Sequence, residues 1–432
     1  MRLTRPPNEL TAGEAAAAIA AGRLTAEALA RACLDRIAAR DGIVHAFAHV
    51  DRDRALEEAR ARDRAATKGP LHGLPFGVKD LIDTHDMPTG MGSPIYRGHR
   101  PPNDASCVAL ARAAGAVMLG KAVTTEFALR HPGPTANPHN PAHTPGGSSS
   151  GSAAAVADFM VPLAFGTQTG GSVIRPASYC GVVGYKPSYD TINPTGVKPL
   201  ANSFDTVGLF ARSVDDCCLA VAVLAGEAAE LRSVAAVKPS RIGLLRGSEW
   251  AEAGADTKRA VEVAAGQLSR AGAIVEDAVL PAMFDAFGET QSMILRFEAA
   301  RVFAWERAMH GDKLSASSRN EIDIGMATPR GRYREGMALI RRCRAAYGEV
   351  LQRFDLLLGA SAPGEAPHGL GNTGGAMFNR LQSGLGVPCL TLPGFHGATR
   401  LPVGVQVMGA MGEDYRLLGF AKWIGERIGE GR

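Results

Sequence analysis

The chain has 432 residues, of which 46% are apolar and 21% charged, and its formal net charge is +4. This composition supports a large buried core and excludes a disordered chain. The small positive charge comes without any block of basic residues, so we expect no nucleic-acid partner.

Seven cysteines are scattered along the chain without a Cys-x-x-Cys pair. Such a set is typical of reduced thiols in a cytoplasmic protein and favours neither a disulfide framework nor a zinc site. The N-terminus leads into no apolar segment of signal-peptide type, and the alanine-rich stretch over 11–20 is too short to span a bilayer. We therefore expect a cytoplasmic protein with no metal and no membrane partner.

Three helices are predicted before residue 69. Thr11 and Glu14 form a capping-box pattern at the start of the first one. A second helix is predicted over 25–40 from apolar residues spaced by four, and a third, heavily charged helix over 51–68. Together they predict a helical N-terminal layer over residues 1–68.

From residue 69 onward, short apolar strands alternate with helices, and the first of these strands ends on Lys79 and Asp80. The other predicted strands cover 117–120, 161–165, 242–245, 356–358, 390–392 and 403–407, and the predicted helices cover 103–115, the residues from 124 onward, and 256–271. Such alternation is typical of an α/β protein with a buried, largely parallel sheet.

The segment 284–353 is predicted to be mostly helical, with polar breaks near Gly311 and Pro329. We interpret this segment as a cap over one end of the sheet. No internal repeat and no long linker divides the chain, so we expect a single domain over residues 1–432.

Two glycine–serine loops bracket one helix–strand unit. The first loop reads Gly-Gly-Ser-Ser-Ser-Gly-Ser over 146–152, and the second reads Gly-Thr-Gln-Thr-Gly-Gly-Ser over 166–172. Small residues let the backbone approach a ligand closely, and consecutive free N–H groups can hold a developing negative charge. This pattern indicates acyl-transfer chemistry.

Other motifs are weaker. The Gly-x-Ser-x-Gly pattern around Ser149 fits a nucleophile elbow, but a proline-broken loop precedes it instead of a strand. An elbow also needs a downstream histidine, and none of the candidates has a distinctive context (His310, His368 and His396). Cys180 is better interpreted as a small buried hydrophobe than as a nucleophile. The Gly-x-Gly-x-x-Gly pattern over 369–374 follows no clear strand and does not indicate a dinucleotide site.

Serine–lysine chemistry remains. A lysine acts as a general base only when it is neutral, so its pKa must fall from about 10.4 through burial or neighbouring donors. Lys79, at the end of an apolar strand, is placed for this role. The alternative is an ordinary lysine paired with Asp80.

Lys79, the loop over 146–149 and the loop over 169–172 resemble the signature of the amidase signature family. Ser148 follows Lys79 by 69 residues, and Ser172 follows Ser148 by 24, and both spacings match that family. The resemblance extends over nearly the whole chain. It implies a single domain with a large mixed, mostly parallel sheet sandwiched between helical layers, and it implies no cofactor.

The resemblance also implies a Ser-Ser-Lys triad in a catalytic core over 69–215. In that triad Ser172 forms the acyl-enzyme, Lys79 is the base and Ser148 relays the proton between them. In relatives the peptide before the bridging serine is cis, which here is the Gly147–Ser148 bond. The implied oxyanion hole consists of backbone N–H groups from the second loop (Thr169, Gly170, Gly171 and Ser172).

In much of the family an arginine stands two residues after the nucleophile, where this chain has Ile174 and places its arginine one residue later, at Arg175. This shift is similar to the malonamidase branch, in which the arginine holds the free carboxylate of a malonate half-amide. We therefore expect substrate binding at Arg175, Thr167 and Gly147. The alternative for Arg175 is a structural ion pair. Leu295 stands where malonamidase has a glutamine, which leaves the particular acid open.

We predict an amide hydrolase that cleaves the C–N bond of a small monoamide, with malonamate held by Arg175 as one candidate substrate. The alternative is the A-type subunit of a tRNA-dependent glutamyl amidotransferase, which releases ammonia from glutamine for a partner that binds tRNA. That subunit typically has aspartate at the place of Gln168 and arginine at the place of Ile174. A non-enzymatic binding protein is disfavoured by the intact triad. A small-molecule amide is the expected partner, and a homodimer, common among relatives, is left open.

Overall fold

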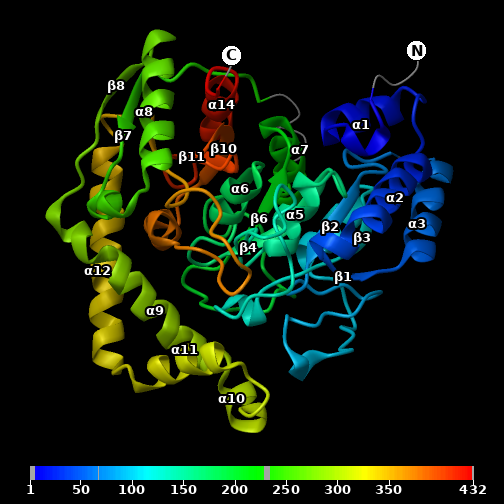
Figure 1. Ribbon diagram of the computed structural model, residues 1–432, viewed down its shortest axis with the longest axis horizontal. Helices are drawn as coiled ribbons and strands as arrows, with labels where there is room; N and C mark the ends of the chain where they lie inside the picture. Colours follow the sequence, from blue (N-terminus) through cyan, green and yellow to red (C-terminus); the bar gives the residue numbers. More distant parts are fainter. Residues whose placement is uncertain (1–4, 67, 228–233, 431–432) are drawn as a thin grey trace.

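The computed structural model describes residues 5–66, 68–227 and 234–430. Its centre is an 11-stranded sheet with the strand order β1-β3-β2-β4-β6-β5-β10-β11-β9-β7-β8 (Figure 1). The strands are β1 Phe47–Val50, β2 Pro75–Lys79, β3 Val117–Ala122, β4 Leu163–Gln168, β5 Val183–Lys186, β6 Thr206–Ala211, β7 Arg241–Leu244, β8 Ile274–Asp277, β9 Leu356–Ala360, β10 Cys389–His396 and β11 Pro402–Met408. All six strands predicted after residue 80 are therefore present.

The sheet is mixed, as predicted, but parallel pairing is not the majority. Parallel pairs join β2 to β3 and β4, and join β7 to β8 and β9. The other pairings, which include all those of β5, β6, β10 and β11, are antiparallel. The reason is local: β10 returns directly as β11 through a short turn after His396, whereas a parallel return needs a long crossover.

The helices are α1 Ala12–Ala20, α2 Ala26–Val44, α3 Arg52–Arg64, α4 Ser106–Ala113, α5 Ser150–Ala157, α6 Ile174–Cys180, α7 Val214–Leu224, α8 Ala255–Arg270, α9 Phe287–Val302, α10 Ala304–His310, α11 Ala316–Ala327, α12 Arg330–Val350, α13 Arg380–Leu385 and α14 Asp414–Gly425. The first three confirm the predicted helical N-terminal segment, and the Thr11–Glu14 capping box forms as predicted. The predicted helical segment 284–353 becomes α9 to α12, with breaks at Gly311 and Pro329.

The helix predicted from residue 124 onward is wrong. Only a 3-10 turn over Glu126–Ala128 forms there, and Phe127 and Ala128 have positive φ angles, which end regular helix. The residues that follow contain a proline every few positions up to Pro145, and proline removes the backbone donors that a helix needs. The segment therefore runs as a loop to the first glycine–serine loop.

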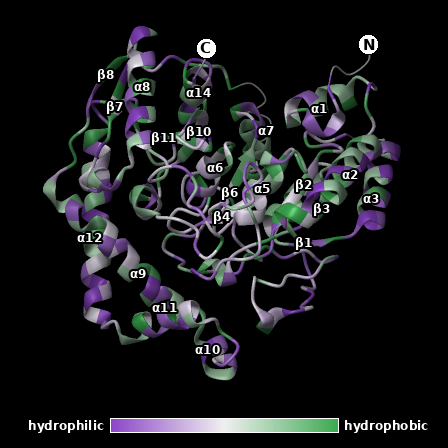
Figure 2. Cartoon of the chain, in the orientation of Figure 1, coloured by the Kyte–Doolittle hydropathy of each residue, from purple (hydrophilic) through white to green (hydrophobic). Residues whose placement is uncertain are grey.

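The central strands position the site by being buried along their whole length, and β2 and β4 are buried at every residue. In Figure 2, hydrophilic residues are frequent along α12, whereas α5 and α7 at the centre are mostly apolar or neutral.

Helix α5 consists of small residues because the neighbouring backbone is close. A Cβ atom on Gly151 would lie 2.1 Å from the carbonyl oxygen of Ala46. This packing fixes the two loops at the ends of α5 and β4.

Candidate active site

Lys79 is the last residue of β2 and is fully buried. Its Nζ donates hydrogen bonds to Ser148 Oγ at 2.8 Å and to Thr167 Oγ1 at 2.7 Å. Burial lowers the pKa of Lys79 well below its ordinary value, and the carboxylate of Asp205 opposes this by raising it. A lysine whose pKa is lowered in this way gives up its proton more readily than an exposed lysine, and its neutral form can accept a proton.

The first glycine–serine loop places Ser148 above Lys79. The Gly147–Ser148 peptide is cis, as the family resemblance implied. Gly146 has a φ angle of 82° and lies against Pro176, where a Cβ would come within 2.8 Å of its Cα. A side chain at this position would therefore displace the loop.

The second loop presents its backbone N–H groups around Ser172. Gln168 Oε1 accepts hydrogen bonds from the N–H groups of Val173 and Ile174, which fixes the entry into α6. Within the described part of the chain, the N–H groups of Gly170, Gly171 and Ser172 have no acceptor. Consecutive donors without acceptors are what an oxyanion hole requires.

A cavity of about 180 Å³, which we call the serine pocket, joins these loops. The predicted residues that line it are Ser148, Thr169, Gly170, Gly171, Ser172 and Arg175. The other predicted residues lie behind this wall. Lys79 donates hydrogen bonds to both Ser148 and Thr167, and the Gly147 carbonyl accepts a hydrogen bond from Arg175. The structure therefore brings all the predicted site residues together.

Arg175 lies in α6 with only 7% of its surface exposed. Its guanidinium donates to the carbonyl oxygens of Gly374 and Gly147 and to Thr373 Oγ1. Its Nε atom is buried without a partner in the described structure. Burial lowers the pKa of Arg175 to about 10, so the side chain remains charged at neutral pH.

The opposite wall of the serine pocket was not predicted in detail. It is formed by Gln291 and Leu295 of α9, by the charged residues Arg130, Arg296 and Glu321, and by residues 373–377 with Arg380. Gln291 lies one helical turn before Leu295, and its Nε2 donates to the carbonyl oxygen of Thr169 at 2.9 Å. The helical spacing of four residues between Gln291 and Leu295 is the sequence signal that could have found this glutamine.

The competing nucleophiles do not line the serine pocket. Ser149 is fully buried, and its hydroxyl exchanges hydrogen bonds with the backbone of Thr167. Burial raises the pKa of the Cys180 thiol, which makes it a poor nucleophile. None of the described histidines lines the pocket. These observations favour serine–lysine chemistry over the alternatives.

One group of side chains in the described structure could hold a metal ion, and it lies outside the serine pocket. It consists of His85, Asp86 and Asp104. Arg112 pairs with both of these carboxylates, at 2.7 Å to Asp86 and 3.2 Å to Asp104. An arginine in this position already neutralises the charge that would attract a cation.

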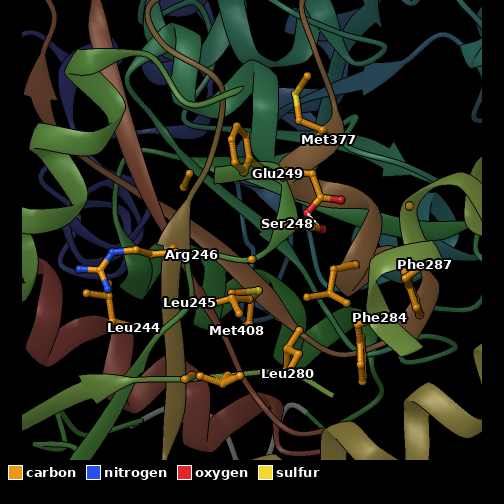
Figure 3. Close-up of a pocket in the computed structure, with 18 of the residues that line it drawn as sticks. Leu244, Leu245, Arg246, Ser248, Glu249, Leu280, Phe284, Phe287, Met377 and Met408 are labelled. Atoms are coloured by element: carbon orange, nitrogen blue, oxygen red, sulfur yellow. Dashed lines mark hydrogen bonds between the residues drawn. The ribbon is translucent and has the colours of Figure 1, made fainter. Parts of the chain in front are cut away.

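A second cavity of about 380 Å³ lies at the carboxyl ends of β7, β8 and β9. Figure 3 shows apolar side chains along it, among them Leu245, Leu280 and Phe284, with Glu249 near Met377. Met377 lines both this cavity and the serine pocket. The two spaces are therefore neighbours across one flexible side chain.

The fold and the site define an enzyme that hydrolyses amide bonds. The family model named Amidase matches residues 28–418, and the chain belongs to this family. Among solved structures, one described as an amidase superposes with a TM-score of 0.90 at 32% identity, covering 97% of this chain and all of that one. The peptide amidase from Stenotrophomonas maltophilia superposes with a TM-score of 0.82 at 30% identity, covering 98% of both chains.

Curated relatives carry a different name, that of the A-type subunit of glutamyl-tRNA(Gln) amidotransferase. The relative from Anaeromyxobacter sp. (strain K) is 33% identical, with 96% of both chains covered. The protein of the same name from Thermobifida fusca (strain YX) is 49% identical, but this match covers 49% of the present chain and only 44% of the relative. For the relatives with the highest local identity, the chain thus spans less than half of their length.

These names correct one expectation from the sequence. Partners were predicted to be a small-molecule amide alone, without nucleic acid, because no basic block is visible. The relatives are by name subunits of an enzyme that acts on glutamyl-tRNA(Gln). Net charge and the absence of a basic block were therefore a poor guide to the partners of proteins of this kind. Among the described helices, none combines the length and the apolar character that crossing a membrane requires.

Proposed function

We propose that the chain releases ammonia from a small carboxylated amide through a seryl acyl-enzyme. The observation that carries this proposal is the buried contact of 2.8 Å between Lys79 Nζ and Ser148 Oγ, at the wall of a pocket that Ser172 also lines. Burial keeps Lys79 neutral for part of the time, which a general base requires.

In the proposed reaction, Ser172 Oγ attacks the amide carbon while its proton passes through Ser148 to Lys79. The oxyanion that forms accepts hydrogen bonds from the N–H groups of Gly170, Gly171 and Ser172, each worth about 3 kcal/mol. The C–N bond then breaks, and the proton returns to the departing nitrogen, so that ammonia leaves. Water then attacks the acyl-enzyme and passes its proton through Ser148 to Lys79. The ester bond breaks, the proton returns to Ser172 Oγ, and the acid is released.

The charge around the serine pocket supports a carboxylated substrate. Four arginines and one glutamate line the pocket (Arg130, Arg175, Arg296, Arg380 and Glu321). An excess of positive charge in a partly enclosed space attracts anions and disfavours cationic amides. Neutral amides gain nothing from this field.

The first candidate substrate is glutamine, with the chain providing the amidase activity of a tRNA-dependent amidotransferase. The names of the relatives that match over 96% of the chain support this assignment. Gln168 departs from the aspartate typical of that subunit. A carboxylate could accept the two backbone hydrogen bonds that its oxygen accepts, but could not replace the one that its Nε2 donates to Ser383. The free state of all seven cysteines supports a cytoplasmic location, where such an assembly would work.

The second candidate is a free-standing amidase for a carboxylated monoamide such as malonamate. It is favoured by the amidase and peptide amidase structures, which superpose over nearly the whole chain. The chemistry at Ser172 is the same in both candidates, and they differ in substrate length and in the need for a partner.

The test is ammonia release by the purified chain from glutamine and malonamate, with Ser172→Ala as the blank. Glutamine hydrolysis, together with co-purification of a partner protein and amidation of glutamyl-tRNA by the complex, supports the first candidate. Hydrolysis of malonamate by the chain alone, without such a complex, supports the second. No release from either amide, with and without co-purified proteins, contradicts the proposal.

A further inference from the structure

We infer that Arg380, the first residue of α13, binds the carboxylate of the amide substrate. This inference rests on the proposed function and names the side chain that reads the acid end of the substrate. It assigns that role to a residue far along the chain from the glycine–serine loops.

Two of the four pocket arginines share a single carboxylate as their counter-charge. Arg130 Nε lies 2.9 Å from Glu321, and Arg296 Nε lies 2.8 Å from the other oxygen of the same side chain. Their fixed arrangement gives the α11 side of the pocket a structural ion-pair cluster. A substrate carboxylate at either guanidinium would compete with Glu321 for the same positive charges.

Arg175 is engaged in a different way. Three of its hydrogen bonds hold the loops on either side of it, through the carbonyl oxygens of Gly147 and Gly374 and the hydroxyl of Thr373. Its Nε atom is buried below the surface of the pocket. Both terminal nitrogens of Arg175 already donate hydrogen bonds to protein oxygens, so a substrate carboxylate would have to compete with these contacts for a bidentate geometry.

Arg380 is the pocket arginine without a partner. Across the described ranges, no carboxylate lies within 4.0 Å of its guanidinium, and the side chain makes no hydrogen bond to protein. It is half-buried, and burial together with the charge of Arg130 lowers its pKa, while Glu249 and Glu289 act in the opposite direction. A half-buried, unpaired guanidinium is unfavourable, and an anionic ligand would relieve that cost.

The position of Arg380 is coupled to the reacting loop. One turn further along α13, Ser383 Oγ donates to the carbonyl oxygen of Gly170 at 2.8 Å and accepts from Gln168 Nε2 at 3.0 Å. On the preceding residue, Asn379 packs so tightly on Gly171 that a Cβ there would lie 2.6 Å from its Oδ1. The backbone of Arg380 is thus held in place relative to the loop that carries Ser172, which suits selection by acid-to-amide length.

The nearest alternative partner of Arg380 is Glu249, at the edge of the second cavity (Figure 3). A Cβ on Gly288 would lie 3.1 Å from Glu249 Oε1 and 4.0 Å from Arg380 Nη1, so the two charges face the same small space. A structural role for Arg380 would therefore take the form of an ion pair with Glu249. If Arg380 only forms an ion pair with Glu249, its replacement should change neither the preference for the carboxylated substrate nor the binding of malonate. If Arg380 binds the substrate, both should fall.

The experiment compares kcat/KM for malonamate with kcat/KM for malonamide, its neutral isostere, in wild type and in Arg380→Gln. We expect the preference for malonamate to fall at least tenfold in Arg380→Gln and to be partly kept in Arg380→Lys. Arg341→Gln, an exposed arginine of α12 outside the pocket, is the matched control and keeps the preference. Arg175→Ala is expected to lower kcat/KM for malonamate and for malonamide by similar factors, because the loss of its hydrogen bonds loosens the loops.

Binding of malonate, measured by titration calorimetry, gives a readout that does not depend on turnover. We expect Arg380→Gln to weaken malonate binding at least tenfold and Glu249→Gln to leave it within about twofold. If the wild type hydrolyses neither amide but binds malonate through Arg380, the proposed function fails and this inference stands. If Arg175→Ala removes the preference while Arg380→Gln keeps it, or if malonate binding is unchanged in Arg380→Gln or absent in wild type, the inference is overturned.

Discussion

The two walls of the serine pocket differ in origin. The wall that carries the proposed chemistry comes from the end of β2 and from the two loops around α5 and β4. In it, Lys79 and Ser148 are buried and Ser172 is partly exposed. The facing wall comes from α9, α11, the start of α13 and the loop that carries Arg130, and its charged side chains range from the buried Glu321 to the exposed Arg130. The proposed catalytic residues are therefore positioned by the sheet and its loops. Most of the side chains that would determine substrate specificity come from helices in distant parts of the chain.

Removing the proposed nucleophile has the largest expected effect. Ser172→Ala should lower ammonia release by about 10⁴-fold or more, because no acyl-enzyme can form without the hydroxyl. Ser149→Ala is the matched control, since Ser149 is a buried serine close by that bonds only to the backbone of Thr167. Equal losses in the two variants would contradict the assignment of Ser172.

Crowding the oxyanion loop should come next. A Cβ on Gly171 would lie 2.6 Å from Asn379 Oδ1, whereas a Cβ on Gly170 would meet nothing within 4 Å. Gly171→Ala should therefore displace the N–H groups of the loop and lower kcat by about 10²-fold to 10³-fold. Gly170→Ala should lower kcat much less than Gly171→Ala does. Steady-state kinetics of both variants, with circular dichroism as a fold control, decides whether the loop position matters as proposed.

The pH profile should shift modestly when Asp205 loses its charge. Burial lowers the pKa of Lys79 and Asp205 raises it, so Asp205→Asn should lower it further. Because the base must be neutral to work, activity rises with pH through this pKa, and the acid limb of kcat/KM should move to lower pH by up to about one unit. Burial raises the pKa of Asp205 itself to about 6, so the difference should appear above that pH.

A shift of the acid limb to higher pH in Asp205→Asn would contradict the role of Lys79 as base. Thr169→Val is a useful companion variant, since Thr169 Oγ1 donates to Asp205 Oδ1. Loss of this hydrogen bond removes a contact that lowers the pKa of Asp205, without removing its carboxylate. The acid limb should therefore move less than in Asp205→Asn.

The smallest effect is expected far from the pocket, in the N-terminal helices. Thr11→Ala removes the side chain that accepts from the Glu14 N–H at the start of α1. We expect a loss of about 1 kcal/mol in the free energy of unfolding and no change in kcat/KM. Chemical denaturation and kinetics of the same sample measure both. A large loss of activity would mean that α1 supports the site more directly than its capping contacts indicate.

Much of the reactive wall could be predicted from the sequence, because its residues belong to short, ordered motifs. Lys79, Ser148 and Ser172 lie in segments whose local composition already requires close backbone packing. The cis Gly147–Ser148 bond could be expected from the family resemblance, not from composition. Capping at Thr11 and the breaks near 311 and 329 were equally local features.

The facing wall could not be predicted in the same way. Arg296 and Glu321 are ordinary charged residues on helices, and only tertiary packing brings Arg130 and Arg296 to the same carboxylate of Glu321. Arg380 carries no local signal, since its importance comes from having no partner. The prediction of a mostly parallel sheet failed for a related reason. Alternating strands and helices predict crossovers between parallel strands, but short returns such as the turn between β10 and β11 make neighbouring strands antiparallel.

Peptide mapping by mass spectrometry after reaction with a serine-reactive fluorophosphonate tests the central claim most directly. We predict one adduct, located on Ser172, which disappears in Ser172→Ala and forms much more slowly in Lys79→Ala, because only Lys79 accepts the serine proton through Ser148. An adduct on Ser149 or on another serine, or an unchanged rate of labelling in Lys79→Ala, would contradict the proposed serine–lysine mechanism.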